Sequence, residues 1–145
     1  TPGFLDRPDA TAEAIGADGW LRSGDVARCD EDGYYFIVDR WKDMFISGGE
    51  NVYPAEVEKV LEAHPDIAEV AVIGIADQRW GEVGKACIGL RPGAATPDPD
   101  SLRAYCRERL AGYKVPKLFE VVDALPRNAL GKVTKQELRD AARPR

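Results

Sequence analysis

The sequence has little of the chemistry that many metal and catalytic sites require. It contains one histidine, His64, and three cysteines, Cys29, Cys87 and Cys106, none of which forms a C-x-x-C pair with another. One histidine makes a histidine-based metal site or a catalytic triad improbable. Because His64 directly precedes Pro65 at the end of an expected helix, the helix dipole explains it better than chemistry does. We therefore expect no metal site, and the odd number of thiols favours a reducing, cytoplasmic setting.

Three further signatures are missing. No apolar run approaches the roughly 20 residues of a membrane-spanning helix, and no signal-peptide pattern opens the chain. No Gly-x-Gly-x-x-Gly fingerprint of a dinucleotide-binding fold occurs. We therefore expect no transmembrane segment. The chain begins at Thr1 without a methionine, which suggests an internal piece of a longer protein.

Charge is present but unevenly distributed. The net charge is −5, yet residues 101–145 carry 11 Lys and Arg against 5 Asp and Glu. A basic C-terminal third suggests an anionic ligand or an acidic partner surface. Nucleic acid is the weaker interpretation, because the basic residues are dispersed and the aromatic residues near them form no stacking motif. We therefore expect no nucleic-acid partner.

The first forty residues predict a short helix followed by a β-hairpin. The helix is expected over residues 8–15. The hairpin joins residues 20–28, a strand interrupted by Ser23-Gly24-Asp25, to residues 34–40 through a turn at Asp32-Gly33. An isolated hairpin is marginal in water. We therefore expect these strands to belong to a larger sheet.

The remainder predicts a small α+β domain of about three strands and three helices. Apolar runs predict strands over residues 67–76, 85–90 and 118–122. Helices are expected over residues 54–63, from Asp98 to a stop at Gly112, and after a capping box that starts at Thr134. The two blocks are joined by residues 39–54, which contain four closely spaced charges and then a glycine doublet. A solvated turn explains the charges but does not require glycines followed directly by a helix.

Lys132 is the first candidate for chemistry. It follows Gly131 on a loop between a strand and a helix, where a long cationic side chain can reach an anionic reaction centre. One preorganised charged donor is worth roughly 3–4 kcal/mol of transition-state stabilisation. The Gly-Lys pair is not a phosphate-binding loop, because Val133 replaces the required Ser or Thr. From spacing alone, an ordinary surface lysine is the commoner outcome.

Asp25 and Arg40 are the next candidates. A carboxylate can accept two hydrogen bonds from a vicinal diol such as ribose, and Gly24 leaves room for close approach. The alternative is an ordinary turn aspartate. Arg40 offers five fixed donors to a ribose or a phosphate, or it merely pairs with Asp39 or Asp43.

Three motifs together resemble the adenylate-forming superfamily, which includes acyl- and aryl-CoA synthetases. They are S-G-D at 23–25, Y-Y-F-I-V-D-R-W-K-D-M-F-I-S-G-G-E-N-V-Y-P-A-E-V-E at 34–58, and P-R-N-A-L-G-K at 126–132. The resemblance implies an ATP-dependent, AMP-forming ligase in which residues 1–40 end the large N-terminal domain and residues 41–145 form a mobile lid domain. The implied substrates are a carboxylic acid, ATP with Mg²⁺, and CoA. The implied partner of the lid is the N-terminal domain of the same enzyme, so the fragment alone is expected to be inactive.

The resemblance also implies roles for single residues. Asp25 and Arg40 would hold the ribose hydroxyls, and Lys132 would contact the carboxylate and the α-phosphate during adenylation. Lys42 matches the hinge of the family. The residues expected to face the site during thioester formation are Gly48, Gly49 and Glu50. Residues 113–117 resemble the CoA-ligase pattern, in which Lys114 or Lys117 would meet a CoA phosphate. An acyl-AMP ligase that loads a carrier protein, and a non-catalytic binding module, remain the alternatives.

Overall fold

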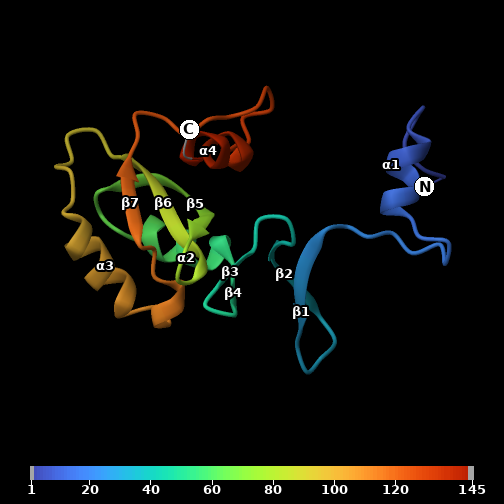
Figure 1. Ribbon diagram of the computed structural model, residues 1–145, viewed down its shortest axis with the longest axis horizontal. Helices are drawn as coiled ribbons and strands as arrows, with labels where there is room; N and C mark the ends of the chain where they lie inside the picture. Colours follow the sequence, from blue (N-terminus) through green and yellow to red (C-terminus); the bar gives the residue numbers. More distant parts are fainter. Residues whose placement is uncertain (1, 144–145) are drawn as a thin grey trace. The chain divides into compact units, whose positions relative to one another are not determined.

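The computed structural model describes residues 2–143, which form two compact units that divide between Lys42 and Asp43 (Figure 1). The first unit contains one short helix and one hairpin. The second contains a five-stranded sheet and three α-helices. The mixed α and β class predicted from the sequence is therefore confirmed.

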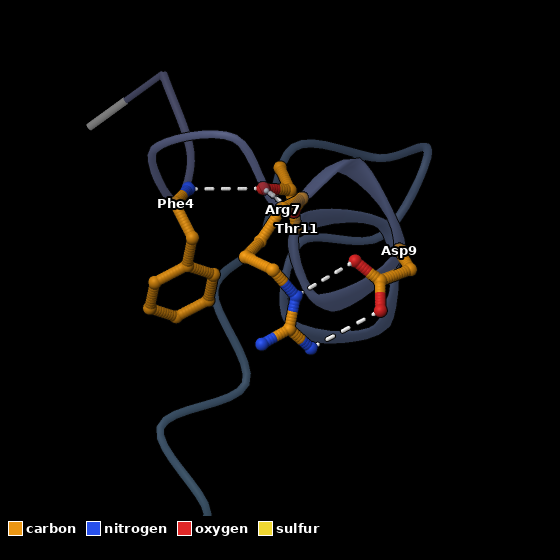
Figure 2. A network of polar contacts seen from close by, with 4 residues as sticks. All are labelled: Phe4, Arg7, Asp9 and Thr11. Carbon is orange, nitrogen blue, oxygen red and sulfur yellow. Dashed lines mark hydrogen bonds and ion pairs between the residues drawn. The ribbon is translucent and has the colours of Figure 1, made fainter.

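The first unit opens with helix α1, Pro8–Ala14. A polar network surrounds its start, as Figure 2 shows: the Arg7 guanidinium donates to both oxygens of Asp9 at 3.1 Å, and the Phe4 amide donates to Oγ1 of Thr11 at 2.9 Å. Pro8 needs no hydrogen-bond acceptor at the first helical position, so it fits the helix start. These contacts hold the helix locally, and none of its residues is buried.

Strands β1, Asp25–Cys29, and β2, Tyr35–Arg40, form an antiparallel hairpin. Its turn is held by Oδ1 of Asp30, which accepts from the amides of Asp32 and Tyr34. The strand starts only after the expected interruption, at residue 25, and residues 20–24 are not part of it. The reason is Gly24, whose φ of +78° breaks the extended backbone just before the strand.

The sheet of the second unit is built around its central strand, β6. The five strands are β3 (Phe45–Ser47), β4 (Glu50–Val52), β5 (Ile67–Asp77), β6 (Gly81–Leu90) and β7 (Leu118–Val121). Their order is β4-β3-β6-β5, and β7 pairs in parallel with β6. Figure 1 shows β5, β6 and β7 side by side. The sequence predicted about three strands, and β3 and β4 are the two that it did not predict.

Helices cover both faces of this sheet. They are α2 (Pro54–Glu62), α3 (Pro99–Arg107) and α4 (Lys135–Ala142). Side chains alternate along a strand, so Val70 and Val72 of β5 pack in the larger core with α2 and α3. Ala71, between them, faces the other way and packs in a smaller cluster with Leu125 and Leu138 of α4. This explains why the sequence of β5 is apolar on both faces.

One feature at a helix end differs from expectation. Thr134 precedes α4, but its side chain makes no capping hydrogen bond, and its hydroxyl is buried without a partner among residues 2–143. The backbone explains this: the Glu137 amide donates to the Thr134 carbonyl instead. His64 lies beyond α2, where its Nδ1 accepts from the Asp66 amide at 3.3 Å and its ring meets Tyr105 edge-on.

Within residues 2–143, no helix combines the length and apolarity needed to cross a bilayer.

Candidate functional site

The hairpin of the first unit brings two of the predicted residues together. Asp25 and Arg40 are direct partners in the register of β1 and β2, and Nε of Arg40 lies 3.5 Å from Oδ1 of Asp25. The Asp25 side chain is 28% exposed and that of Arg40 is 61% exposed, so both can reach a ligand from solvent. Asp43, in the second unit, pairs with Arg139 of α4 at 2.9 Å.

A small cleft adjoins this pair. It is lined by Ser23, Gly24, Arg40, Trp41 and Lys42. The Trp41 amide donates to the Gly24 carbonyl at 2.8 Å, which holds the S-G-D segment against the end of β2. Lys42 is the last residue of this unit.

The glycine doublet forms the turn of the β3–β4 hairpin. Gly48 and Gly49 have φ values of +61° and +89°, the left-handed conformation that a type I′ hairpin turn requires at both positions. Trp80 backs this turn: its carbonyl accepts from the Gly48 amide at 2.9 Å. A Cβ atom at Gly48 would lie 2.7 Å from Cε3 of Trp80, so no larger residue fits there without displacement. Glu50, the first residue after the turn, is exposed.

The two candidate CoA-binding lysines differ in their surroundings. The Lys114 ammonium donates to both oxygens of Glu56 at 2.7 Å, and this hydrogen bond raises the pKa of Lys114. The Lys117 ammonium lies 5.6 Å from the ring centroid of Trp80. Among residues 2–143 it has no carboxylate within ion-pair distance. Lys117 is therefore the better placed of the two to bind an anion beside the glycine turn.

Lys132 lies on a loop that its own backbone closes. The Thr134 amide donates to the Pro126 carbonyl at 2.8 Å, and the Asn128 amide donates to the Lys132 carbonyl at 2.9 Å. Gly131, at φ +76°, completes the turn. The Lys132 side chain is exposed, and within the described part of the chain its ammonium has no ion-pair or hydrogen-bond partner.

Trp80 is the site feature that the sequence did not single out. The indole, 39% exposed, has the Arg79 guanidinium 5.0 Å and the Lys117 ammonium 5.6 Å from its ring centroid. Two cations and an aromatic face beside a glycine turn suit an anionic ligand with a flat ring. Trp80 lies 32 positions after Gly48 in the chain, so only the pairing of β3 with β6 at Ser47 and Gly81 shows their relation.

Comparison with known proteins gives a consistent result. Residues 56–132 match the family model described as the AMP-binding enzyme C-terminal domain. The chain is 56% identical over 137 residues to a feruloyl-CoA synthase of Amycolatopsis sp., covering 94% of this chain and 28% of the relative. It is 49% identical over 133 residues to the fatty acid–[acyl-carrier-protein] ligase ScoC of Streptomyces coeruleorubidus, covering 92% of this chain and 25% of that relative.

Solved structures agree with the sequence relatives. The o-succinylbenzoate CoA synthetase of Bacillus subtilis, solved with its acyl-adenylate intermediate, matches with a TM-score of 0.87 and 42% identity. The match covers 99% of this chain and 29% of that one. The chain thus spans between a quarter and a third of the length of the proteins it matches.

Proposed function

Since the chain belongs to the family of AMP-binding enzyme C-terminal domains, we propose that it is the C-terminal portion of an ATP-dependent, AMP-forming acid–CoA ligase. The enzyme first joins a carboxylic acid to AMP and releases pyrophosphate. The CoA thiol then attacks the acyl carbon and displaces AMP. Residues 1–40 end the large domain that holds the nucleotide and the acid, and residues 41–145 are the mobile lid. The named activities of the relatives support this proposal.

Lys132 supplies the charge for the first step. The observation that carries the function is an exposed ammonium without a partner among residues 2–143, at the tip of a loop fixed by backbone hydrogen bonds. Such a group needs little reorganisation to meet negative charge on the α-phosphate and the carboxylate. We assign Lys132 this catalytic role.

Asp25 and Arg40 hold the ribose. The Asp25 carboxylate accepts from the two hydroxyls, and Arg40, 3.5 Å away, adds its own donors. Mg²⁺ enters with the phosphates of ATP as part of that substrate.

The glycine turn serves the second step. Gly48 and Gly49 leave open backbone along which the pantetheine arm of CoA can pass, with Glu50 beside it. Lys117 meets a CoA phosphate next to Trp80. Lys114 is the weaker candidate, because Glu56 already neutralises it.

Lys42 acts as the hinge between the two steps. It is the last residue of the first unit, and the next residue, Asp43, is tied to α4 through Arg139. Rotation about the backbone at Lys42 then moves the lid as one body, presenting Lys132 first and the glycine turn second. Three free cysteines support a cytoplasmic enzyme.

The identity of the acceptor has one alternative with support. A relative 49% identical to the chain ligates fatty acids to an acyl carrier protein. In that case a carrier-bound pantetheine replaces CoA at the glycine turn, and Lys117 has no adenosine phosphate to bind. Removing the charge of Lys117 would raise the KM for CoA in a CoA ligase and leave a carrier ligase unchanged.

The test of the proposal is Lys132→Ala in the full-length enzyme. We expect acyl-adenylate formation, measured by ATP–pyrophosphate exchange, to fall by about 10²–10³-fold, the usual cost of losing one charged donor in the transition state. Thioester formation from supplied acyl-adenylate should remain within about 3-fold of the wild type, because the lysine acts only in the first step.

Lys59→Ala is the matched control. Lys59 is an exposed lysine of α2 with no proposed role, so both half-reactions should be unchanged. An equal loss of both half-reactions in Lys132→Ala would show that the lysine is structural.

A further inference from the structure

The loop that carries Lys132 is tied to the sheet through a single arginine. Nη1 of Arg127 donates to the Gly131 carbonyl at 2.8 Å, and Nη2 donates to Oε2 of Glu69 on β5. One planar guanidinium therefore joins a rigid strand to the residue immediately before Lys132. An arginine can do this because its donors are held in a fixed fork, which a lysine lacks.

Glu69 holds the base of the same loop. Its Oε1 accepts from the Leu125 amide at 3.2 Å, while its Oε2 accepts from Arg127. Glu69 shares a face of β5 with Ala71, which packs against α4, so this carboxylate stands on an otherwise apolar face. The strand opposite leaves space for it: a Cβ atom at Gly89 would lie 2.7 Å from Cγ of Glu69.

Asn128 orders the tip of the loop. Its Oδ1 accepts from the amides of Leu130 and Lys132, each at 3.0 Å. An asparagine that binds backbone two and four residues ahead fixes the turn and, with it, the direction of the Lys132 backbone. The backbone of Lys132 is thus held from the tip by Asn128 and from the sheet by Arg127 and Glu69.

We propose that Glu69 and Arg127 are positioning residues for Lys132, acting with Asn128 to aim its ammonium during adenylation. The proposal rests on the proposed function of Lys132 and goes beyond it by assigning a positioning role to Glu69, a carboxylate on the sheet. Stability alone does not account for the pair: its side chains are 30% and 46% exposed, and ion pairs so exposed add little to folding. A displacement of about 1 Å at a reacting group, by contrast, can cost about 10²-fold in rate.

The experiment uses Arg127→Gln and Glu69→Gln in the full-length enzyme. Each should lower kcat of acyl-adenylate formation by about 10–100-fold while the KM for ATP stays within about 3-fold, since orientation and not binding is lost. Thioester formation from supplied acyl-adenylate should be unchanged. The double variant should be no worse than either single variant, because both remove one connection. Arg127→Lys should recover only part of the rate, because it keeps the charge without the fork.

Glu120→Gln is the control. It breaks an ion pair with Lys85 on the same sheet, so both half-reactions should remain at wild-type rates. The melting temperature of every variant is measured alongside. If Arg127→Gln fails to fold, the nearly isosteric Glu69→Gln decides.

The outcomes separate the two proposals. If Lys132→Ala abolishes adenylation while Glu69→Gln and Arg127→Gln leave it intact, the positioning role is wrong and the function of Lys132 stands. If the Glu69 and Arg127 variants slow both half-reactions equally, the pair is structural and the positioning role is again wrong. If Lys132→Ala itself spares adenylation, the proposed function fails, and the positioning role fails with it.

Discussion

The two units of the chain differ in where their apolar side chains lie: the second unit buries them and the first unit exposes them. In the described residues, every buried apolar side chain of the core lies between Phe45 and Leu125. Of the fifteen large apolar side chains that are exposed within residues 2–143, nine lie between Phe4 and Trp41. The second unit has a complete core, with helices on both faces of a sheet. The first unit has secondary structure, but residues 2–42 contain no buried apolar side chain.

This difference shows what each unit needs in order to be stable. Burial of apolar surface supplies most of the free energy of folding. The aromatic strand at residues 34–37 exposes all four side chains, so its hairpin gains little by itself. In the proposed enzyme these side chains belong to the large domain. The lid has its own core, so it can stay folded while it moves.

The largest expected effect comes from separating the units. Residues 43–145 expressed alone should fold cooperatively, with a free energy of unfolding of about 5–10 kcal/mol, as is usual for a domain of that size. Residues 1–42 expressed alone should not fold, because a lone hairpin is marginal in water. Far-UV circular dichroism during urea denaturation measures both.

A sigmoidal urea transition for residues 1–42 would break the comparison, since it would require a core that the structure does not contain. A gradual, non-cooperative loss of signal from residues 43–145 would contradict the other half of the comparison, namely that the second unit folds cooperatively on its own core. The intact chain serves as the reference for the transition midpoint.

A second effect, smaller but still large, comes from truncating one side chain in each unit. Leu61→Ala should lower the free energy of unfolding of the main transition by about 2–5 kcal/mol, because Leu61 is fully buried on α2. Tyr35→Ala should change it by less than about 0.5 kcal/mol, because Tyr35 is 77% exposed. Urea melts of the intact chain compare the two.

Similar costs for the two substitutions would mean that the hairpin takes part in the cooperative unit. Ile37→Ala, at a second exposed position of β2, checks that the result for Tyr35 is not particular to one residue.

Much of this architecture could be predicted from local patterns. Proline at the first position identified the starts of α2 and α3, and the Asp98 side chain does cap α3 by accepting from Ser101 at 3.0 Å. The long apolar run of β5 was also predictable, because eleven residues give enough periods to show two buried faces. Strands β3 and β4 were not: each has three residues, too few for an alternation to be seen.

The residues of the candidate site also divide into those that local sequence patterns predict and those that they do not. Asp25, Arg40 and Lys132 lie in sequence motifs and could be singled out, although their roles stay predictions. Trp80 and Glu69 could not, because each contacts residues distant in the chain: Glu69 meets Arg127 58 positions later. Tertiary pairing, which no local pattern encodes, determines such contacts. The capping box at Thr134 is the opposite case. Its local pattern is typical of a helix start, but the Thr134 carbonyl, and not its side chain, accepts from the Glu137 amide.

The smallest expected effect concerns the thiols. Cys29 is exposed in the first unit, whereas Cys87 and Cys106 are buried in the second. A disulfide reagent such as Ellman's should therefore modify one thiol of the native chain at least about 100-fold faster than the other two, which react only when the second unit opens. Three thiols reacting at one rate would show that the core of the second unit is not closed.

The same thiols predict how stability depends on pH. Burial raises the pKa of Cys106 from 9.0 to about 11. As the pH rises from about 9 to about 11, the unfolded chain therefore loses this proton first, and the free energy of unfolding of the second unit should fall by up to about 2 kcal/mol. Below pH 9 the thiol is protonated in both states and contributes no slope. Cys106→Ala should reduce the slope in this range and leave the part due to Cys87, whose pKa burial also raises. Cys29→Ala, at an exposed thiol, is the control and should leave the slope unchanged. An equal effect of the two substitutions would mean that the slope arises elsewhere, for instance at Lys114, whose raised pKa gives a stabilisation that is lost only above about pH 10.5.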